Sequence, residues 1–158
     1  MLSHIDKNNQ PSMVDVSKKI ATVRTAHARA IIKLNKEIIE LFSGEDIKSK
    51  KGPVFQTAII AGIMAAKKTS ALIPLCHPIG LEDCQIKIAL NDSEEAVIDC
   101  ITKVTHKTGV EMEALTGASV AALTIYDMCK AISHDLVIKE IKLIEKKGGK
   151  SDFYGAKT

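Results

Sequence analysis

Two charged side chains at the end of an otherwise uncharged segment are the first candidates for chemistry. Between Glu113 and Tyr126 the polar side chains are all hydroxyls, and Asp127 and Lys130 then follow within four residues. On a helix surface such a pair is ordinarily an ion pair worth about 0.2–0.5 kcal/mol. Beside a largely buried helix the pair needs partners or a cleft, and a lysine there can have a lowered pKa and act as an acid or base.

A stiff loop supplies a second group of candidates. Pro74 and Pro78 bracket Cys76 and His77 within Leu72–Gly80, so the loop is extended and cannot join a helix. Rigid loops often carry site residues, although a lone histidine in apolar surroundings is more often a satisfied core group. Because the two side chains are sequence neighbours, a Cys–His nucleophilic pair is poorly supported, and no further ligands at metal-site spacing accompany them.

Lysines in loops form the third group. Lys51 ends a basic turn, where it is either a solvated charge or a phosphate contact. The basic, glycine-rich segment Glu145–Ser151 superficially resembles a phosphate loop, but Ile144 stands where the leading glycine belongs and no helix follows. Its glycines would still let the backbone approach an anion beside Lys146 and Lys150. A frayed basic tail is the alternative.

A long helix is expected to position the first pair. The alanine-rich composition predicts a helix over about residues 108–133, and its uncharged part is shorter than the roughly 20 residues that cross a bilayer. Two carboxylates, Glu111 and Glu113, fall in its first turn, where they complement the helix dipole. Side chains spaced three or four residues apart share one face of such a helix. On this helix they are Glu113, Thr116, Val120, Thr124 and Asp127, and Lys130 extends the same face.

The remaining pattern predicts an α+β fold. Alternation over Val23–Leu34 favours a half-buried strand, with an alanine-rich helix as the alternative, and Gln85–Leu90 and Ala96–Val104 read as two strands joined by a turn. We further expect a short strand at Met13–Val16 and a helix over Lys36–Phe42 that Asn35 caps. A second helix should run from Pro53 to Thr69. Residues 136–144 should form a final strand pair or one bent strand. Without strict alternation of strands and helices, a mainly antiparallel sheet covered by helices on one face is expected.

Composition predicts one domain of ordinary globular character. The 158 residues carry 22 basic and 19 acidic side chains, and the aromatic content of 3% argues against a stacking surface for single-stranded nucleic acid. We expect a flexible lead-in at residues 1–12 and one folded domain with a basic, glycine-rich C-terminal tail at residues 13–158. The four cysteines form no C-x-x-C pair and follow no secretory leader, which favours free thiols in the cytoplasm and no membrane association.

Six segments together carry the motifs of one family: Met13–Ser17, Lys51–Gly52, Ala61–Ile63, Leu72–Pro78, Lys107–Thr116 and Leu123–Ala131. They closely resemble the MoaC family, the cyclic pyranopterin monophosphate synthases of molybdenum cofactor biosynthesis. The resemblance extends over residues 13–153. At the tail the family commonly reads Gly-Gly-Lys-Ser-Gly-Asp, whereas this chain lacks the glycine after Ser151.

The resemblance implies a ferredoxin-like α+β subunit in a homohexamer, a trimer of dimers, with active sites at subunit interfaces. It implies a lyase that converts 3′,8-cyclo-7,8-dihydroguanosine 5′-triphosphate to cyclic pyranopterin monophosphate by general acid/base catalysis. Pyrophosphate is released, and neither a metal nor a redox cofactor is required.

The resemblance also assigns residues. Asp127 and Lys130 match the family's catalytic pair. Its substrate-contacting segments match Leu75, Cys76, His77, Met112 and Glu113, and its further basic site residues match Arg24, Lys51 and Lys146. Glu111 or Glu113 would hydrogen-bond a guanine-type edge, and the cations would hold the phosphates.

Two alternatives stand beside the lyase. A nucleotide-binding regulatory module would use the same cations to hold a triphosphate without turnover. A structural oligomer would use the alanine-rich helix as an interface and the Asp127–Lys130 pair as an interchain contact. Replacing Lys130 by alanine distinguishes the two alternatives. A nucleotide-binding module would bind its ligand more weakly and show no turnover before or after the change, whereas a structural oligomer would lose its assembly.

Overall fold

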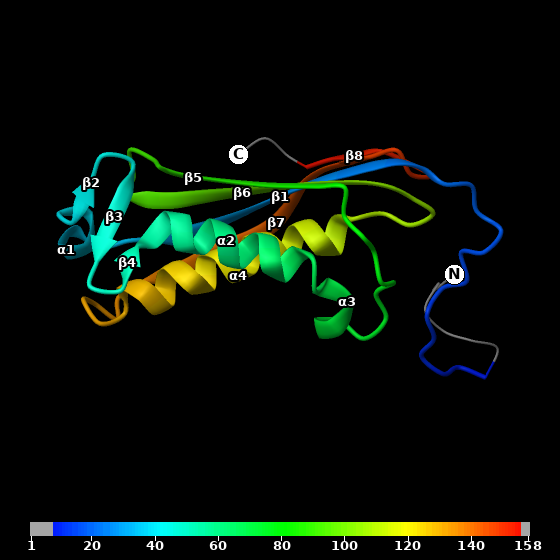
Figure 1. Ribbon diagram of the computed structural model, residues 1–158, viewed down its shortest axis with the longest axis horizontal. Coiled ribbons are helices and arrows are strands. Elements are labelled where there is room, and N and C mark those ends of the chain that lie inside the picture. Colours follow the sequence, from blue (N-terminus) through cyan, green and yellow to red (C-terminus); the bar gives the residue numbers. More distant parts are fainter. Residues whose placement is uncertain (1–7, 156–158) are drawn as a thin grey trace.

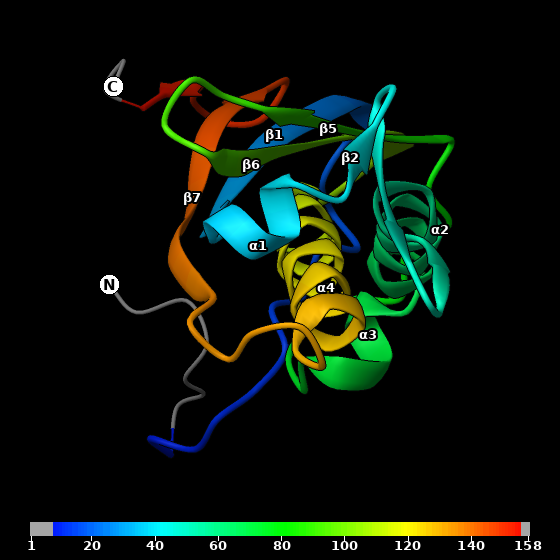
Figure 2. The same ribbon diagram turned by 90° about the vertical axis from the view of Figure 1, so that its left-hand side faces the viewer.

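The computed structural model describes residues 8–155, in which an antiparallel sheet is covered on one face by two long helices (Figure 1, Figure 2). The strand order is β5-β6-β1-β7-β8. The elements involved are β1 (Thr22–Lys33), α2 (Val54–Ala66), β5 (Asp83–Leu90), β6 (Glu95–His106), α4 (Glu111–Cys129), β7 (Val137–Lys147) and β8 (Phe153–Tyr154). Apart from the two-residue β8, this order and the succession β-α-β-β-α-β form the ferredoxin-like α+β arrangement that the resemblance implied.

Strand β1 is central, and its alternation decides its two faces. Ala26, Ala28, Ala30 and Ile32 are buried against the helices, while the residues between them face away. The strand prediction is therefore confirmed and the helical alternative is wrong. β1 pairs with β6 along its whole length and with β7 across two irregularities of register. β7 is thus the single bent strand that was one of the two expectations for this region.

The two long helices approach each other closely through two glycines. A Cβ on Gly62 of α2 would lie 2.7 Å from the Gly117 carbonyl oxygen of α4. A Cβ on Gly117 would lie 2.7 Å from Cys100 Sγ in the sheet beneath. Larger residues would therefore force the layers apart, and this tight packing fixes the position of α4 against β1, β6 and β7. α4 is shorter than expected at both ends, but both predicted carboxylates lie in its first turn.

Short elements close one end of the layer (Figure 2). They are α1 (Lys36–Ile39), β2 (Phe42–Ser43), β3 (Asp46–Ser49) and β4 (Gly52–Pro53), while α3 (Thr69–Leu72) follows α2. Asn35 caps α1 as expected, because its side chain accepts from the Ile38 amide at 3.1 Å. The prediction that this helix continues to Phe42 is wrong, since Phe42 pairs with Ile47 and packs edge-on against Phe55 at 5.7 Å between ring centroids.

Both ends of the chain differ from expectation where they are described. Met13–Val16 is not a strand, because the Val14 carbonyl bonds to a histidine side chain and the Asp15 carboxylate accepts from the Ser17 amide at 2.8 Å. The expected lead-in at residues 1–12 lies mostly outside the described residues. At the other end the frayed-tail alternative is wrong for residues 145–155, which form the β7–β8 hairpin around Gly148, at φ +84°.

None of the helices within residues 8–155 is both long enough and apolar enough to span a membrane.

Candidate active site

The predicted site residues gather at the two opposite ends of α4 (Figure 1). Glu113 lies in the first turn and Asp127 near the last. At 1.5 Å of rise per residue their Cα atoms are about 21 Å apart along the axis. A single subunit therefore separates the matched catalytic pair from most of the matched substrate-contacting residues.

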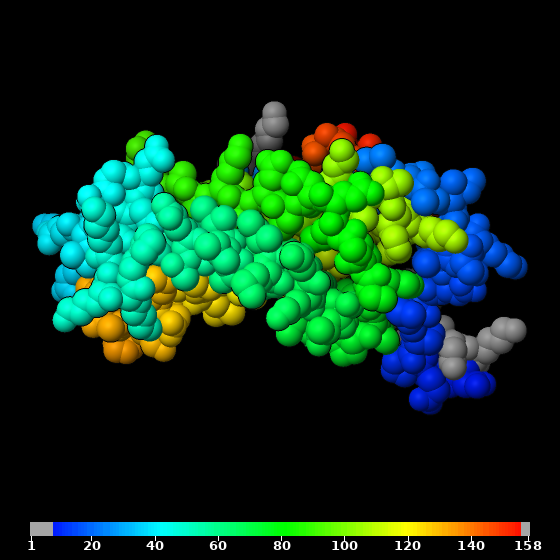
Figure 3. Space-filling view, viewed as in Figure 1, coloured from blue at the N-terminus to red at the C-terminus, as the bar shows by residue number. Residues whose placement is uncertain are grey.

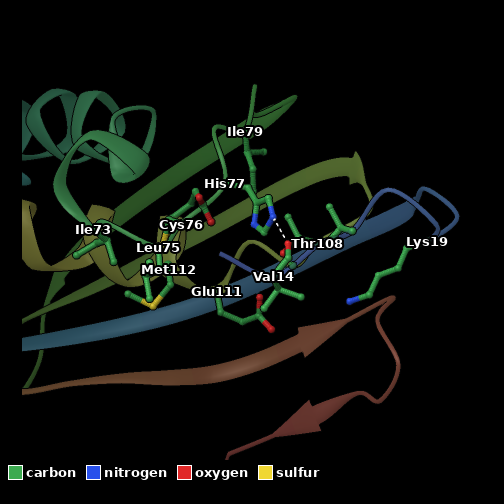
Figure 4. A pocket seen from close by; sticks show the side chains of 13 residues that line it. Val14, Lys19, Ile73, Leu75, Cys76, His77, Ile79, Thr108, Glu111 and Met112 are labelled. Atoms are coloured by element: carbon green, nitrogen blue, oxygen red, sulfur yellow. Dashed lines mark hydrogen bonds between the residues drawn. The ribbon is translucent and has the colours of Figure 1, made fainter. Parts of the chain in front are cut away.

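An apolar cavity of about 520 Å³ lies at the first end, between the loop after α3, the segment before β1 and the start of α4 (Figure 4). We call it the N-terminal pocket. Six predicted site residues line it: Leu75, Cys76, His77, Glu111, Met112 and Glu113. His77 Nε2 lies 2.8 Å from the Val14 carbonyl oxygen. Because a carbonyl oxygen only accepts hydrogen bonds, His77 Nε2 must carry the proton. This hydrogen bond ties the N-terminal segment to the loop after α3, and the two segments are in contact in the space-filling view (Figure 3).

Glu113 is the buried carboxyl group of this pocket. Glu113 is only 3% exposed. Burial raises the pKa of its carboxyl group, and the nearby charge of Glu111 raises that pKa further. The pKa of Cys76 is also raised, by burial first and then by the charge of Glu113. Since His77 bonds to Val14, the geometry supports the earlier argument against a Cys–His nucleophile. A protonated Glu113 could both donate a hydrogen bond and accept one from a heterocyclic edge.

A second, smaller cavity of about 150 Å³ adjoins the first, and we call it the cationic pocket. It has one carboxylate, Glu111, and six basic residues: Lys19, Arg24, Lys107, Lys146, Lys147 and Lys150. Both pockets share Lys19, Thr108, Gly109 and Glu111, so they are contiguous. Lys146 Nζ lies 3.0 Å from Glu111 Oε1, and Arg24 Nε is buried without a hydrogen-bond partner among the described residues. Such a pocket is suited to an anion with several negative charges.

The other end of α4 carries a small ionic group that we call the C-terminal cluster, Lys51, Asp127 and Lys130. Asp127 Oδ1 lies 2.8 Å from Lys130 Nζ, and its Oδ2 lies 3.0 Å from Lys51 Nζ. Lys51 Nζ also donates to the Asp127 carbonyl oxygen at 3.1 Å. The sequence named all three residues, but it gave no sign that Lys51 would reach the catalytic pair.

The environment of this cluster differs from the expectation for Lys130. All three side chains are about half exposed, at 49% for each lysine and 55% for Asp127. The hydrogen bond that Lys130 donates to Asp127 raises the pKa of Lys130, and the hydrogen bonds that both lysines donate lower the pKa of Asp127. The sequence allowed for a lowered pKa at Lys130, as a buried lysine can have. The pKa is raised instead, because ion pairing prevails where burial is slight.

Three basic residues of the cationic pocket were not predicted as site residues: Lys19, Lys107 and Lys147. Lys19 lies in the segment before β1, and Lys107 follows β6 and donates to the Ser17 carbonyl oxygen at 2.8 Å. Lys107 stands inside a motif of the resemblance, which was the available signal, whereas nothing in the spacing distinguishes Lys19 from other surface lysines. Within residues 8–155, no group of three or more His, Cys, Asp or Glu side chains is arranged to hold a metal ion.

The protein has a ferredoxin-like fold in which an apolar cavity adjoins a cationic one, an arrangement suited to a ring system that bears phosphates. The MoaC family profile matches residues 13–149, and the chain belongs to the MoaC family. It is 46% identical over 155 residues to "Cyclic pyranopterin monophosphate synthase" of Xanthomonas axonopodis pv. citri, covering 98% of this chain and 94% of that protein.

Two longer proteins are similar over almost the whole chain. "Molybdenum cofactor biosynthesis bifunctional protein" of Synechocystis sp. is 53% identical over 156 residues, or 96% of this chain and 45% of that protein. "Molybdenum cofactor biosynthesis protein 1" of Dictyostelium discoideum is 52% identical over 166 residues, or 94% of this chain and 26% of that protein. The chain therefore spans less than half of each of these two relatives.

Proposed function

We propose that the protein is a cyclic pyranopterin monophosphate synthase, a lyase of molybdenum cofactor biosynthesis. Its substrate would be 3′,8-cyclo-7,8-dihydroguanosine 5′-triphosphate and its second product pyrophosphate. The observation that carries this proposal is the continuity of the N-terminal pocket with the cationic pocket, which suits a purine-derived ring joined to a triphosphate. The name of the Xanthomonas relative, which is matched along 94% of its length, supports the same reaction.

The two pockets suggest how the substrate lies. The ring would enter the N-terminal pocket, where the buried Glu113 hydrogen-bonds the guanine-type edge between Met112 and the loop residues Leu75 and Cys76. The triphosphate would extend past Thr108 into the cationic pocket, toward Arg24 and its unpartnered Nε. Six cations there would stabilise the charge that develops as an oxygen of the substrate attacks the α-phosphorus and pyrophosphate leaves.

The catalytic pair must then come from another copy of the chain. Along the helix axis Asp127 lies about 21 Å and Lys130 about 25 Å from Glu113 in the same chain, too far to reach a ligand in the N-terminal pocket. An isologous dimer would solve this by bringing the C-terminal cluster of one subunit to the pockets of the other. Exposed apolar side chains on the outer faces of the helices, Ile60, Met64 and Leu123, supply a surface for association. We therefore propose a homo-oligomer with composite sites, and a trimer of dimers as its form.

The ionisation of the C-terminal cluster suggests the roles of its members. Asp127 pairs with two lysines and stays ionised, while Lys130 keeps its proton at neutral pH. We assign Lys130 as the acid that delivers a proton during rearrangement of the ring, and Asp127 as the carboxylate that orients it and receives protons in exchange. Lys51, held by the same carboxylate, would add positive charge near the phosphates.

Pyrophosphate release from the cyclic dihydro-GTP intermediate tests the proposal. Lys130→Ala should lower turnover by about 10²–10⁴-fold, the usual range for a general acid. Lys33→Ala is the matched control, because Lys33 is also a half-exposed lysine beside a carboxylate, 3.9 Å from Glu94, but lies outside the pockets and the C-terminal cluster. The size of the assembly is measured for all three proteins.

The outcomes separate the lyase from its two alternatives. Loss of turnover in an intact Lys130→Ala oligomer, with Lys33→Ala unaffected, supports the lyase. A wild type that assembles and binds the intermediate without turnover would instead be a nucleotide-binding module. An oligomer that falls apart on Lys130→Ala would make the Asp127–Lys130 pair a structural contact.

Three further properties belong to the same proposal. We assign the catalytic domain to residues 13–158 and expect activity without an added metal or redox cofactor, measured in the presence of a chelator. We place the reaction in the cytoplasm, which is compatible with four cysteines that are all free thiols: Cys76, Cys84, Cys100 and Cys129.

A further inference from the structure

We propose that Glu111 is an internal counter-anion of the phosphate subsite, which occupies the subsite when it is empty and competes with pyrophosphate for Lys146. This inference rests on the proposed function, because it takes the cationic pocket as the place where the substrate's phosphates bind. It gives Glu111 a role different from that of Glu113, although the sequence offered both carboxylates equally for the guanine-type edge.

The contacts of Glu111 carry the first step. Its Oε1 lies 3.0 Å from Lys146 Nζ, and both side chains are about one-third exposed, at 29% and 34%. Glu111 is also the only acidic residue among those lining the cationic pocket within the described part of the chain. A phosphate oxygen that approaches Lys146 must therefore replace this carboxylate or lie beside it with a like charge.

The loop before α4 leaves room for this carboxylate. A Cβ on Gly109 would overlap the Glu111 carboxylate group, so the side chain lies where any other residue at position 109 would project. Gly109 and Glu111 both line the two pockets, and the carboxylate consequently lies at the junction through which the ligand must pass. The structure thus places one negative charge, on a flexible side chain, between the N-terminal pocket and the cationic pocket.

The advantage of such a charge lies in product release. Lys147 already pairs with Glu145 at 2.9 Å. Without Glu111, the other five cations would bind the leaving pyrophosphate strongly, and its departure would limit turnover. A carboxylate that returns to Lys146 as the pyrophosphate leaves offsets part of the cost of uncovering that cation. Arg24 differs from Lys146, since its buried Nε has no hydrogen-bond partner among the described residues.

Titration with inorganic pyrophosphate tests the inference without turnover. The proteins are the assembled wild type, Glu111→Gln and the control Glu140→Gln, which removes the same charge from a carboxylate 3.1 Å from Lys142 and outside the pockets. Glu111→Gln should bind pyrophosphate about ten-fold more tightly, or about 1.4 kcal/mol. Glu140→Gln should bind like the wild type. The ionic strength is held constant because exposed charges are screened.

A second variant also removes the Glu111 carboxylate from Lys146, by displacing it rather than by neutralising it. Gly109→Ala keeps the charge of Glu111 but displaces its carboxylate, and only the end of a flexible side chain has to move. It should therefore also tighten pyrophosphate binding, and both variants should show stronger inhibition of turnover by added pyrophosphate than the wild type.

The results distinguish this inference from the proposed function. Pyrophosphate binding that is unchanged or weaker in Glu111→Gln overturns the inference alone and makes the Glu111–Lys146 pair a support for the position of the lysine. Absence of pyrophosphate binding in the wild type and in Glu140→Gln overturns the phosphate subsite itself, and the inference with it.

Discussion

The two ends of α4 differ in how they hold their charged groups. At the N-terminal end Glu113 is buried in a cavity, and burial raises its pKa. At the C-terminal end Asp127 and Lys130 are half exposed, and their mutual hydrogen bond shifts their pKa values in opposite directions, down for the acid and up for the lysine. The matched substrate-contacting residues lie at one end, in the N-terminal pocket. The matched catalytic pair lies at the other end, where Lys51 lines a separate cavity of about 310 Å³.

The surrounding elements explain this difference. The N-terminal end is enclosed by the segment before β1, the loop after α3 and the β7–β8 turn, which come from three distant parts of the chain. At the C-terminal end the cluster receives Lys51 from the β3–β4 turn. Under the composite site proposed above, a neighbouring copy of the chain would bring the two ends together.

The largest effect is expected when variants damaged at opposite ends of α4 are mixed, which tests whether the two ends act together across a subunit interface. Lys130→Ala and Lys146→Ala damage opposite ends of α4, and each homo-oligomer should be nearly inactive. Random re-association at equal concentration should restore about one quarter of wild-type turnover, because one site in four then combines two intact halves. The measurement is pyrophosphate release after dissociation and reassembly. Mixing Lys130→Ala with Asp127→Asn, which damage the same half, is the control and should restore no activity.

A mixture of Lys130→Ala and Lys146→Ala that stays inactive, although exchange of subunits is demonstrated by mass, would mean that each subunit uses its own two ends. The composite site would then be wrong.

The pH dependence of stability would sharpen the contrast between the two carboxylates. Because the folded pKa of Glu113 is raised, the wild type should lose stability as pH rises from the ordinary glutamate value, about 4.3, through the raised one. Glu113→Gln should remove this loss and be more stable than the wild type by about 1 kcal/mol at neutral pH, the scale of a desolvated polar group. Thermal unfolding of the assembled proteins across this range measures the difference.

Asp127→Asn is the matched control for that series. The lysines lower the pKa of Asp127, so its contribution to stability is present above the ordinary aspartate value and is lost as pH falls. The exposed variant should consequently show no gain at neutral pH. A Glu113→Gln protein that tracks the wild type at every pH would mean that Glu113 has no raised pKa in the assembly.

The smallest effect is expected at Cys76, in the same pocket as Glu113. Its pKa is raised by burial, so the thiol stays protonated, and the neighbouring His77 bonds to Val14. Cys76→Ala should reduce kcat/KM by less than about ten-fold, the scale of one lost apolar contact. Cys84→Ala, at a half-buried cysteine outside the pockets, is the control and should leave kcat/KM unchanged. Abolished turnover in a folded Cys76→Ala protein would restore the thiol as a nucleophile.

Much of the fold could be predicted from local pattern. Alternation identified β1, β5 and β6, and the alanine-rich segment identified α4, because a buried face leaves a period in the sequence. The errors fall where a distant contact prevails over local preference. Phe42 leaves the predicted helix to pack on Phe55, and Val14 leaves the predicted strand to bond with His77.

The sequence alone determined which residue types could form the site, since the motifs around Leu75–His77, Met112–Glu113 and Asp127–Lys130 each stand within one local segment. Only the tertiary structure decided how they are grouped. It brings Lys51 to Asp127 across 76 residues of sequence, sets Lys146 against Glu111, and divides the candidates between the two ends of one helix. The reason is physical: a periodic pattern reports which face of an element is buried, whereas the pairing of strands and the packing of layers determine which distant side chains meet.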